Sequence, residues 1–105
     1  MKITGSCREG VLTLRFHGEL DHHVSREAME ALSERIDAFL PGSCVLDLRD
    51  LSFMDSSGIG LVMGRYKLMH AMGGRLRVRG VNRSTMKVMK LAGLDLLAKI
   101  DCKGE

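Results

Sequence analysis

Aromatic residues are scarce in this chain of 105 residues, which has no tryptophan, one tyrosine and three phenylalanines. Single-stranded nucleic acids are bound largely by stacking of bases on aromatic rings, so the chain offers little surface for that purpose. Basic residues do cluster at Arg75, Arg77 and Arg79, but no recognition helix or RNP-like motif accompanies them. We interpret these arginines as the solvated face of a strand and expect no nucleic-acid partner, despite a net charge of +3.

Cysteine is also scarce. The chain has three, Cys7, Cys44 and Cys102, which are far apart and form no CxxC pair. Disulfide scaffolds and structural zinc sites need more thiols at closer spacing. We therefore expect three free, reduced thiols, as in a cytoplasmic protein, with Cys44 acting as a small core residue of an apolar strand.

Long apolar runs are absent, since no segment approaches the ~20 residues needed to cross a bilayer. Residues 1–5 contain one basic residue and no apolar stretch of the kind found in secretory signals. We expect a cytoplasmic location and no membrane partner. Hydrophobic residues make up 45% of the chain and charged residues 28%, a balance typical of a folded globular protein. The length suits one domain, expected over residues 1–105.

Patterns typical of strands and of helices alternate along the chain. Strands separated by helices imply crossover connections and a sheet with helices packed on it. We therefore predict an α/β fold with a mixed or parallel sheet of about four to five strands and three to four helices. Strands are predicted over residues 11–16, 44–48 and 76–81, with 2–7 as a hairpin partner of the first; helices are predicted over 22–39, 56–72 and from Asn82 or Ser84 to Gly93, and a last short element over 94–100.

The most informative segment is Asp55-Ser56-Ser57-Gly58, which joins an apolar strand to the second predicted helix. Asp55, Ser56 or Ser57 can each cap that helix by accepting hydrogen bonds from its first free backbone N–H groups. A capping role alone would account for the local pattern. A functional role needs a further observation.

The second predicted helix provides one, because its apolar residues fall into two stripes at about 100° per residue. A helix lying on a sheet needs only one such stripe. The other stripe begins with a hydroxyl and has a small gap at Gly64, which suggests docking against a partner. A neighbouring helix of the same protein packed on this stripe would explain it equally well. The expected core stripe contains Ile59, Val62, Met63, Tyr66 and Met69, and the expected docking stripe contains Ser57, Leu61, Gly64 and Leu68.

A hydroxyl at the start of a docking stripe suits a charge switch. Phosphorylation would add about −1.5 to −2 charges at neutral pH. Because Ser57 would lie at a helix N-terminus, the helix dipole and free N–H groups would accommodate the phosphate, and the fold should survive. An apolar contact made across Ser57 would be lost, so the sequence predicts a binding switch that does not require unfolding.

Four blocks of sequence carry a family resemblance: GELDHH at 18–23, VLDL at 45–48, FMDSSGIG at 53–60 and GRYK at 64–67, with LAGL at 91–94 near the end. They resemble the anti-sigma factor antagonists of the STAS family, and among these the sporulation antagonists. A general-stress antagonist or another partner-switching protein of the family is the alternative. The resemblance covers nearly the whole chain.

The resemblance implies that Ser57 is the phosphoacceptor. The implied partner is an anti-sigma factor that is also a serine kinase and supplies the ATP; it is bound by the unphosphorylated antagonist, which frees a sigma factor. A PP2C-type serine phosphatase would reset the switch, and the free antagonist is expected to be a monomer. The resemblance also places Asp21 on the partner surface, although it could equally cap the first helix, and Asp55 beside the acceptor. The full expected partner surface is Asp21, Ser56, Ser57, Gly58, Leu61, Gly64 and Leu68, with Asp55 shaping the loop.

An enzyme is one rival interpretation, with Ser56 or Ser57 as nucleophile and a histidine as base. However, the Gly-x-Ser-x-Gly elbow of many serine hydrolases is missing, because Met54 and Asp55 precede Ser56. A chain of 105 residues also leaves little room for a substrate pocket. We expect no catalytic residue.

Metal and nucleotide sites are two further rivals. His22 and His23 are adjacent at a helix start and would point about 100° apart, so they would rarely share one ion. Gly58, Gly60 and Gly64 match neither the Gly-Lys-Ser/Thr of a P-loop nor Gly-x-Gly-x-x-Gly. We expect no metal and no cofactor, with weak nucleotide contact left open.

Overall fold

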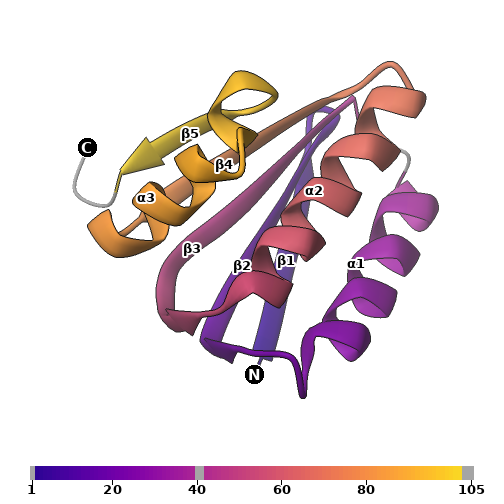
Figure 1. Cartoon of the computed structure of the whole chain (residues 1–105). Coiled ribbons are helices and arrows are strands. Elements are labelled where there is room, and N and C mark those ends of the chain that lie inside the picture. The colour runs from indigo at the N-terminus through magenta and orange to yellow at the C-terminus, as the bar shows by residue number, and fades with distance from the viewer. Residues whose placement is uncertain (1, 40–41, 103–105) are drawn as a thin grey trace.

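The computed structural model describes residues 2–39 and 42–102. Residues 1, 40–41 and 103–105 of the expected domain lie outside the described residues. The described residues form five strands, three α-helices and one 3-10 helix (Figure 1). The strands are β1 (Lys2–Arg8), β2 (Val11–Leu20), β3 (Ser43–Met54), β4 (Arg75–Val81) and β5 (Lys99–Cys102); the helices are α1 (Ser25–Phe39), α2 (Ser56–Ala71), α3 (Arg83–Leu91) and the 3-10 helix η1 (Leu94–Leu96).

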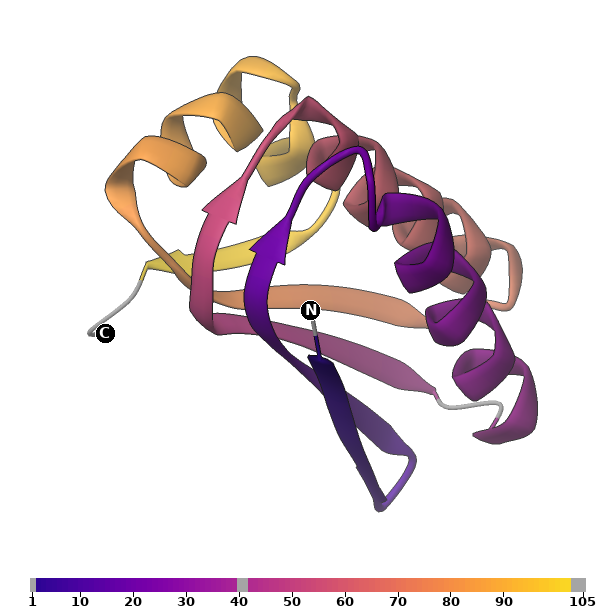
Figure 2. The same ribbon diagram turned by 90° about the horizontal axis from the view of Figure 1, so that it is seen from below.

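The five strands form one sheet in the order β1-β2-β3-β4-β5. β1 and β2 pair antiparallel as a hairpin, and each later neighbour pairs parallel. Parallel neighbours need crossover connections, which α1, α2 and α3 supply. Figure 2 shows these three helices on one side of the sheet, with the opposite face uncovered. The predicted α/β fold with a mixed sheet is confirmed, including the hairpin partner over residues 2–7.

The core lies between the sheet and the helices. On β2, alternate residues Leu12, Leu14 and Phe16 are buried, because successive side chains of a strand point to opposite faces. On α1, Ala28, Leu32 and Ile36 are buried at a spacing of four residues, which keeps them on one side of the helix. Full burial of a leucine or phenylalanine side chain contributes roughly 1.5–3 kcal/mol, so these rows hold the layers together.

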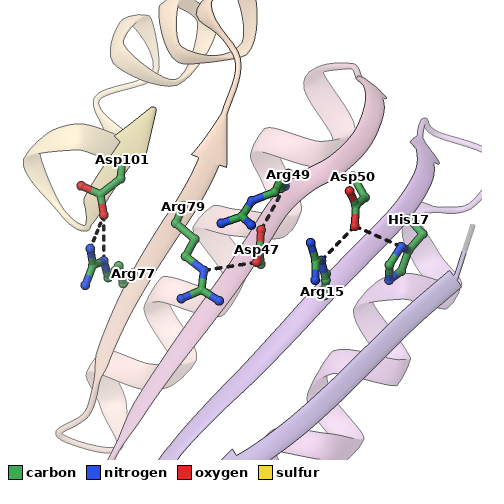
Figure 3. A network of polar contacts seen from close by, with 8 residues as sticks. All are labelled: Arg15, His17, Asp47, Arg49, Asp50, Arg77, Arg79 and Asp101. Carbon is green, nitrogen blue, oxygen red and sulfur yellow. Dashed lines mark hydrogen bonds and ion pairs between the residues drawn. The ribbon is translucent and has the colours of Figure 1, made fainter. Parts of the chain in front are cut away.

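The uncovered face of the sheet carries ion pairs between neighbouring strands (Figure 3). This face includes the arginines of β4 that the sequence assigned to a solvated strand face: Arg75 and Arg77 are exposed and Arg79 is half-buried. The pairs join β2 to β3 through Arg15 and Asp50 (Nε–Oδ2 2.9 Å), β3 to β4 through Asp47 and Arg79 (Oδ2–Nε 3.2 Å), and β4 to β5 through Arg77 and Asp101 (Nη2–Oδ2 2.6 Å).

Several boundaries differ from the sequence prediction. The strand predicted to end at residue 16 continues to Leu20, and the strand predicted to end at residue 48 continues to Met54. The first helix begins at Ser25 rather than at residue 22, because the Asp21 carboxylate accepts hydrogen bonds from the N–H groups of His23 (2.9 Å) and Val24 (3.3 Å) and closes a turn there. The last element, predicted as one piece over 94–100, is split into η1 and β5. β5 pairs with β4, a contact between segments distant in sequence that local patterns do not show.

All three cysteines are free, as predicted, and Cys44 is buried in β3. Burial raises the pKa of the Cys44 thiol to about 11, against a smaller opposing effect of the Arg65 guanidinium. This thiol is therefore protonated at neutral pH and acts as a core side chain. None of the helices in the described part of the chain is long and apolar enough to cross a membrane.

Candidate functional site

The N-terminus of α2 lies where β3 ends. Asp55 follows β3 with extended backbone (φ −98°, ψ −170°) and is the N-cap of α2. Its Oδ1 accepts a hydrogen bond from the Ser57 backbone N–H at 2.9 Å. Of the three candidates for the cap, the structure selects Asp55, which leaves the hydroxyls of Ser56 and Ser57 available for other roles.

Ser57 also donates its hydroxyl to Asp55 Oδ1, so both donors of this serine meet one carboxylate oxygen. The Ser57 side chain is half-buried, whereas Ser56, the first residue of α2, is exposed. The hydrogen bond from the Ser57 hydroxyl, together with those from the Ser57 and His22 N–H groups, lowers the pKa of Asp55 against an opposing effect of burial. Asp55 is therefore ionised at neutral pH.

The other oxygen of Asp55 faces a different segment. Asp55 Oδ2 accepts a hydrogen bond from the His22 backbone N–H at 3.1 Å and lies 3.7 Å from His22 Nδ1. The Asp55 N–H donates to the Leu20 carbonyl at 3.2 Å. β2 and β3 run parallel and pair Leu20 with Met54 at their ends, so the chain following each strand emerges at the same edge of the sheet. Residues 21–24, here called the β2–α1 loop, thus lie beside Ser57.

Asp21 is half-buried in the β2–α1 loop. Its Oδ1 accepts from the N–H groups of His23 and Val24 and closes the turn before α1, so Asp21 holds this turn and is not the N-cap of the helix, which begins at Ser25. The structure also brings Asp21 to the same edge of the sheet as Ser56 and Ser57. These three members of the expected partner surface come from segments more than thirty residues apart and meet at one end of the molecule.

The expected docking stripe on α2 is wrong at Leu61, and the wider expected partner surface is wrong at Gly58. Leu61 is fully buried, as is Val62 beside it, so the helix presents the line between the two predicted stripes to the sheet. Gly58 is buried too, and a Cβ at this position would collide with the Met54 side chain. Gly64 and Leu68 are half-buried, at the border of the exposed side. The buried residues of α2 are Gly58, Leu61, Val62 and Met69.

The exposed side of α2 is therefore different from the one expected. It carries Ser56, Gly60 and Lys67, of which the last two were not singled out as contact residues in the sequence. A Cβ added at Gly60 or Gly64 would meet nothing within 4 Å, so neither glycine is needed for packing inside the protein. These two positions leave the helix backbone open to close approach from outside.

Arg65, within the GRYK block, has a structural role. Its Nη1 donates to the Met29 carbonyl (2.8 Å) and to the Ser33 hydroxyl (2.7 Å), both on α1. This guanidinium joins α2 to α1.

The chemistry of the site is that of an accessible hydroxyl and not of a relay. The single proton of the Ser57 hydroxyl is donated to a carboxylate, whereas a serine nucleophile of the hydrolase type donates to a histidine base. Within residues 2–39 and 42–102, no group of three or more His, Cys, Asp and Glu side chains could hold a metal ion. The arrangement fits a group-accepting oxygen at a helix N-terminus.

Known proteins of similar sequence and structure identify the family of this chain. The model of the STAS domain matches residues 2–102. The chain is 42% identical over 94 residues to an anti-sigma F factor antagonist of Paenibacillus polymyxa, and the aligned region covers 90% of this chain and 80% of that protein.

Two solved structures have the same fold. One is the anti-sigma factor antagonist SpoIIAA in its unphosphorylated form (27% identity, TM-score 0.75, covering 94% of this chain and 86% of that chain). The other is the Bacillus cell fate determinant SpoIIAA in the phosphorylated form (29% identity, TM-score 0.75, covering 94% and 90%). With a family model matched along nearly its entire length, the chain belongs to the STAS domain family.

Proposed function

We propose that this protein is an anti-sigma factor antagonist whose binding to an anti-sigma factor is switched off by phosphorylation of Ser57. The observation that carries the proposal is the position of the Ser57 hydroxyl, at the N-terminus of α2 and beside the β2–α1 loop. The similarity to antagonists, one of which is known in phosphorylated and unphosphorylated forms, supports it.

Ser57 is preferred to Ser56 as the acceptor because of its surroundings. Ser57 is held in one place by two hydrogen bonds to Asp55, whereas Ser56 is exposed. A fixed oxygen presents the same geometry to an incoming phosphoryl group each time. The dipole of the 16-residue helix α2 favours negative charge at this end, so the modified protein should stay folded.

The proposed partner is an anti-sigma factor that is also a serine kinase and brings its own ATP, and a PP2C-type phosphatase removes the phosphate. The sigma factor released would be a sporulation sigma factor, in the cytoplasm, and the protein would act as a regulatory binder and not as an enzyme. The proposed contact surface comprises Asp21, Ser56 and Ser57, followed along α2 by Gly60, Gly64 and Leu68. Gly58 and Leu61 support this surface from inside.

The test is mass spectrometry after incubation with ATP and an anti-sigma F factor kinase, combined with a binding assay. We expect one phosphate, located on Ser57, and loss of kinase binding in the modified protein. Ser56→Ala is the matched control, since it removes the neighbouring hydroxyl and should still be phosphorylated. Phosphate located on Ser56, or a phosphorylated protein that binds as well as the unmodified one, would contradict the proposal.

A further inference from the structure

A single carboxylate joins the switch serine to the β2–α1 loop. Asp55 Oδ1 accepts the two hydrogen bonds of Ser57, and Oδ2 accepts the one from the His22 N–H. The two oxygens belong to one planar group, so the carboxylate cannot turn to follow a change at Ser57 and also keep its geometry toward His22. A chemical change at Ser57 therefore alters the contact between Asp55 and the β2–α1 loop.

Phosphorylation of Ser57 would change this carboxylate's surroundings in two ways. Esterification of Oγ removes the proton that Oγ donates to Asp55. It also attaches a phosphate carrying about −1.5 to −2 charges to an atom that had been within hydrogen-bonding distance of a carboxylate oxygen. The phosphate can take over the N–H groups at the start of α2, for which it then competes with Asp55. Asp55 loses its donors and gains a like-charged neighbour.

Resting on the proposed function, we propose that phosphorylation of Ser57 displaces the Asp55 carboxylate and thereby releases the β2–α1 loop from the N-terminus of α2. Asp55 is a positioning residue in this scheme. It holds the loop that carries Asp21 in the form that binds the partner, and it does so only while Ser57 is unmodified. Two effects then weaken partner binding: the charge on phosphorylated Ser57, and the loss of the loop conformation that binds the partner.

The release is local. The Asp55 N–H still donates to the Leu20 carbonyl, which secures the start of the loop. The turn made by Asp21 with the N–H groups of His23 and Val24 does not involve Asp55 and stays closed. The change is thus concentrated on the His22 N–H, and the neighbouring His23 N–H is an internal reference.

Amide hydrogen exchange measured by NMR tests the proposal, on the full chain with phosphoserine installed at position 57 during translation. Exchange at the His22 N–H should accelerate on the order of tenfold relative to the unmodified protein, the factor expected for loss of one hydrogen bond. Exchange at the His23 N–H should change less than about twofold. Ser57→Ala is the control for loss of the hydroxyl alone: it keeps the N–H to Asp55, adds no charge, and should leave the His22 N–H protected.

Asp55→Asn gives a second readout without phosphate. The asparagine oxygen can still cap α2, but its NH₂ group cannot accept from the His22 N–H. Exchange at His22 should therefore be fast in this variant before any modification.

Equal protection of His22 in the phosphoserine protein and the unmodified protein would overturn the proposal. The binding assay separates this failure from a failure of the proposed function. If the phosphoserine protein no longer binds its partner but the His22 N–H stays protected, the proposed phosphorylation switch is supported and the proposed release of the loop is contradicted. If the His22 N–H loses protection yet the protein binds its partner as tightly as before, the release is supported and the switch is contradicted.

Discussion

Ser57 and Asp55 form a closed pair in which one carboxylate oxygen accepts both the N–H and the hydroxyl of the serine. The same contact caps α2 and orients the proposed phosphoacceptor, so the local structure and the proposed switch depend on one interaction. A cap can be tested by stability and a switch by binding.

Replacement of Ser57 should separate the two states of the proposed switch. Ser57→Ala keeps the backbone N–H to Asp55 and removes the acceptor oxygen, so it should bind the partner kinase at all times and accept no phosphate. Ser57→Asp puts a carboxylate near Asp55 and should weaken binding by roughly tenfold or more, because like charges brought into an interface cost several kcal/mol. Titration calorimetry with the kinase measures both. Equal affinities for Ala and Asp at this position would argue against a charge switch.

Leu61 should be required for stability. Leu61→Ala removes a fully buried side chain and should lower the free energy of unfolding by about 2–5 kcal/mol, because it leaves a cavity between α2 and the sheet. Lys67→Ala, on the exposed side of the same helix, is the control and should change stability by less than about 0.5 kcal/mol. Urea denaturation followed by circular dichroism gives both values. A Leu61→Ala protein as stable as the parent would contradict the full burial of the Leu61 side chain.

Leu61 also shows where the sequence was insufficient. Strands and helices followed from local patterns: the alternation of Leu12, Leu14 and Phe16 and the spacing of Ala28, Leu32 and Ile36 each specify one buried side. In α2, apolar residues occur all around the helix, so no single stripe marks the side that faces the sheet. Which side is buried depends on how α2 lies against β3, β4 and α1, and a helical wheel does not contain that information.

The site was predictable in part for a similar reason. The position of Ser57 at a helix start follows from residues adjacent in sequence, and the structure places it there. The contact of Asp55 with the His22 N–H joins residues 33 positions apart and depends on the parallel register of β2 and β3. The sequence draws attention to the ring of His22 as a possible metal ligand, whereas its backbone N–H makes the contact with Asp55.

The lowered pKa of Asp55 predicts the direction of a pH effect. Hydrogen bonds from the Ser57 hydroxyl and the neighbouring N–H groups favour the ionised form in the folded protein, so its pKa lies below the ordinary value of 3.8. Such a group contributes stability above pH 3.8, and this contribution is lost as the pH falls through the lower, folded-state pKa. Asp55→Asn should therefore lose less stability than the parent on acidification below that pH. Urea midpoints at neutral and acidic pH measure the difference, and parallel losses in both proteins would contradict it.

Gly58 and Gly60 should respond in opposite ways to alanine. Gly58→Ala forces a Cβ into the Met54 side chain and should destabilise the protein by roughly 1–3 kcal/mol. Gly60→Ala adds a methyl group where nothing lies within 4 Å and should stabilise α2 by about 0.5–1 kcal/mol, the usual gain for removing a helical glycine. Thermal unfolding of the two variants compares them directly. Similar effects at both positions would show that Met54 moves aside without cost.

Gly64→Ala should stabilise the protein and weaken its binding. No atom lies within 4 Å of the added Cβ, so the fold should gain about 0.5–1 kcal/mol from the higher helix propensity of alanine. A glycine that costs stability and serves no internal packing is explained if a partner approaches the helix backbone at this point. The added methyl group would then sit in the interface, and affinity for the kinase should fall while the melting temperature rises. Lys67→Ala, one turn further along α2, is the control for a change on the same exposed helix. A Gly64→Ala protein that is more stable and binds normally would remove this part of α2 from the proposed contact surface.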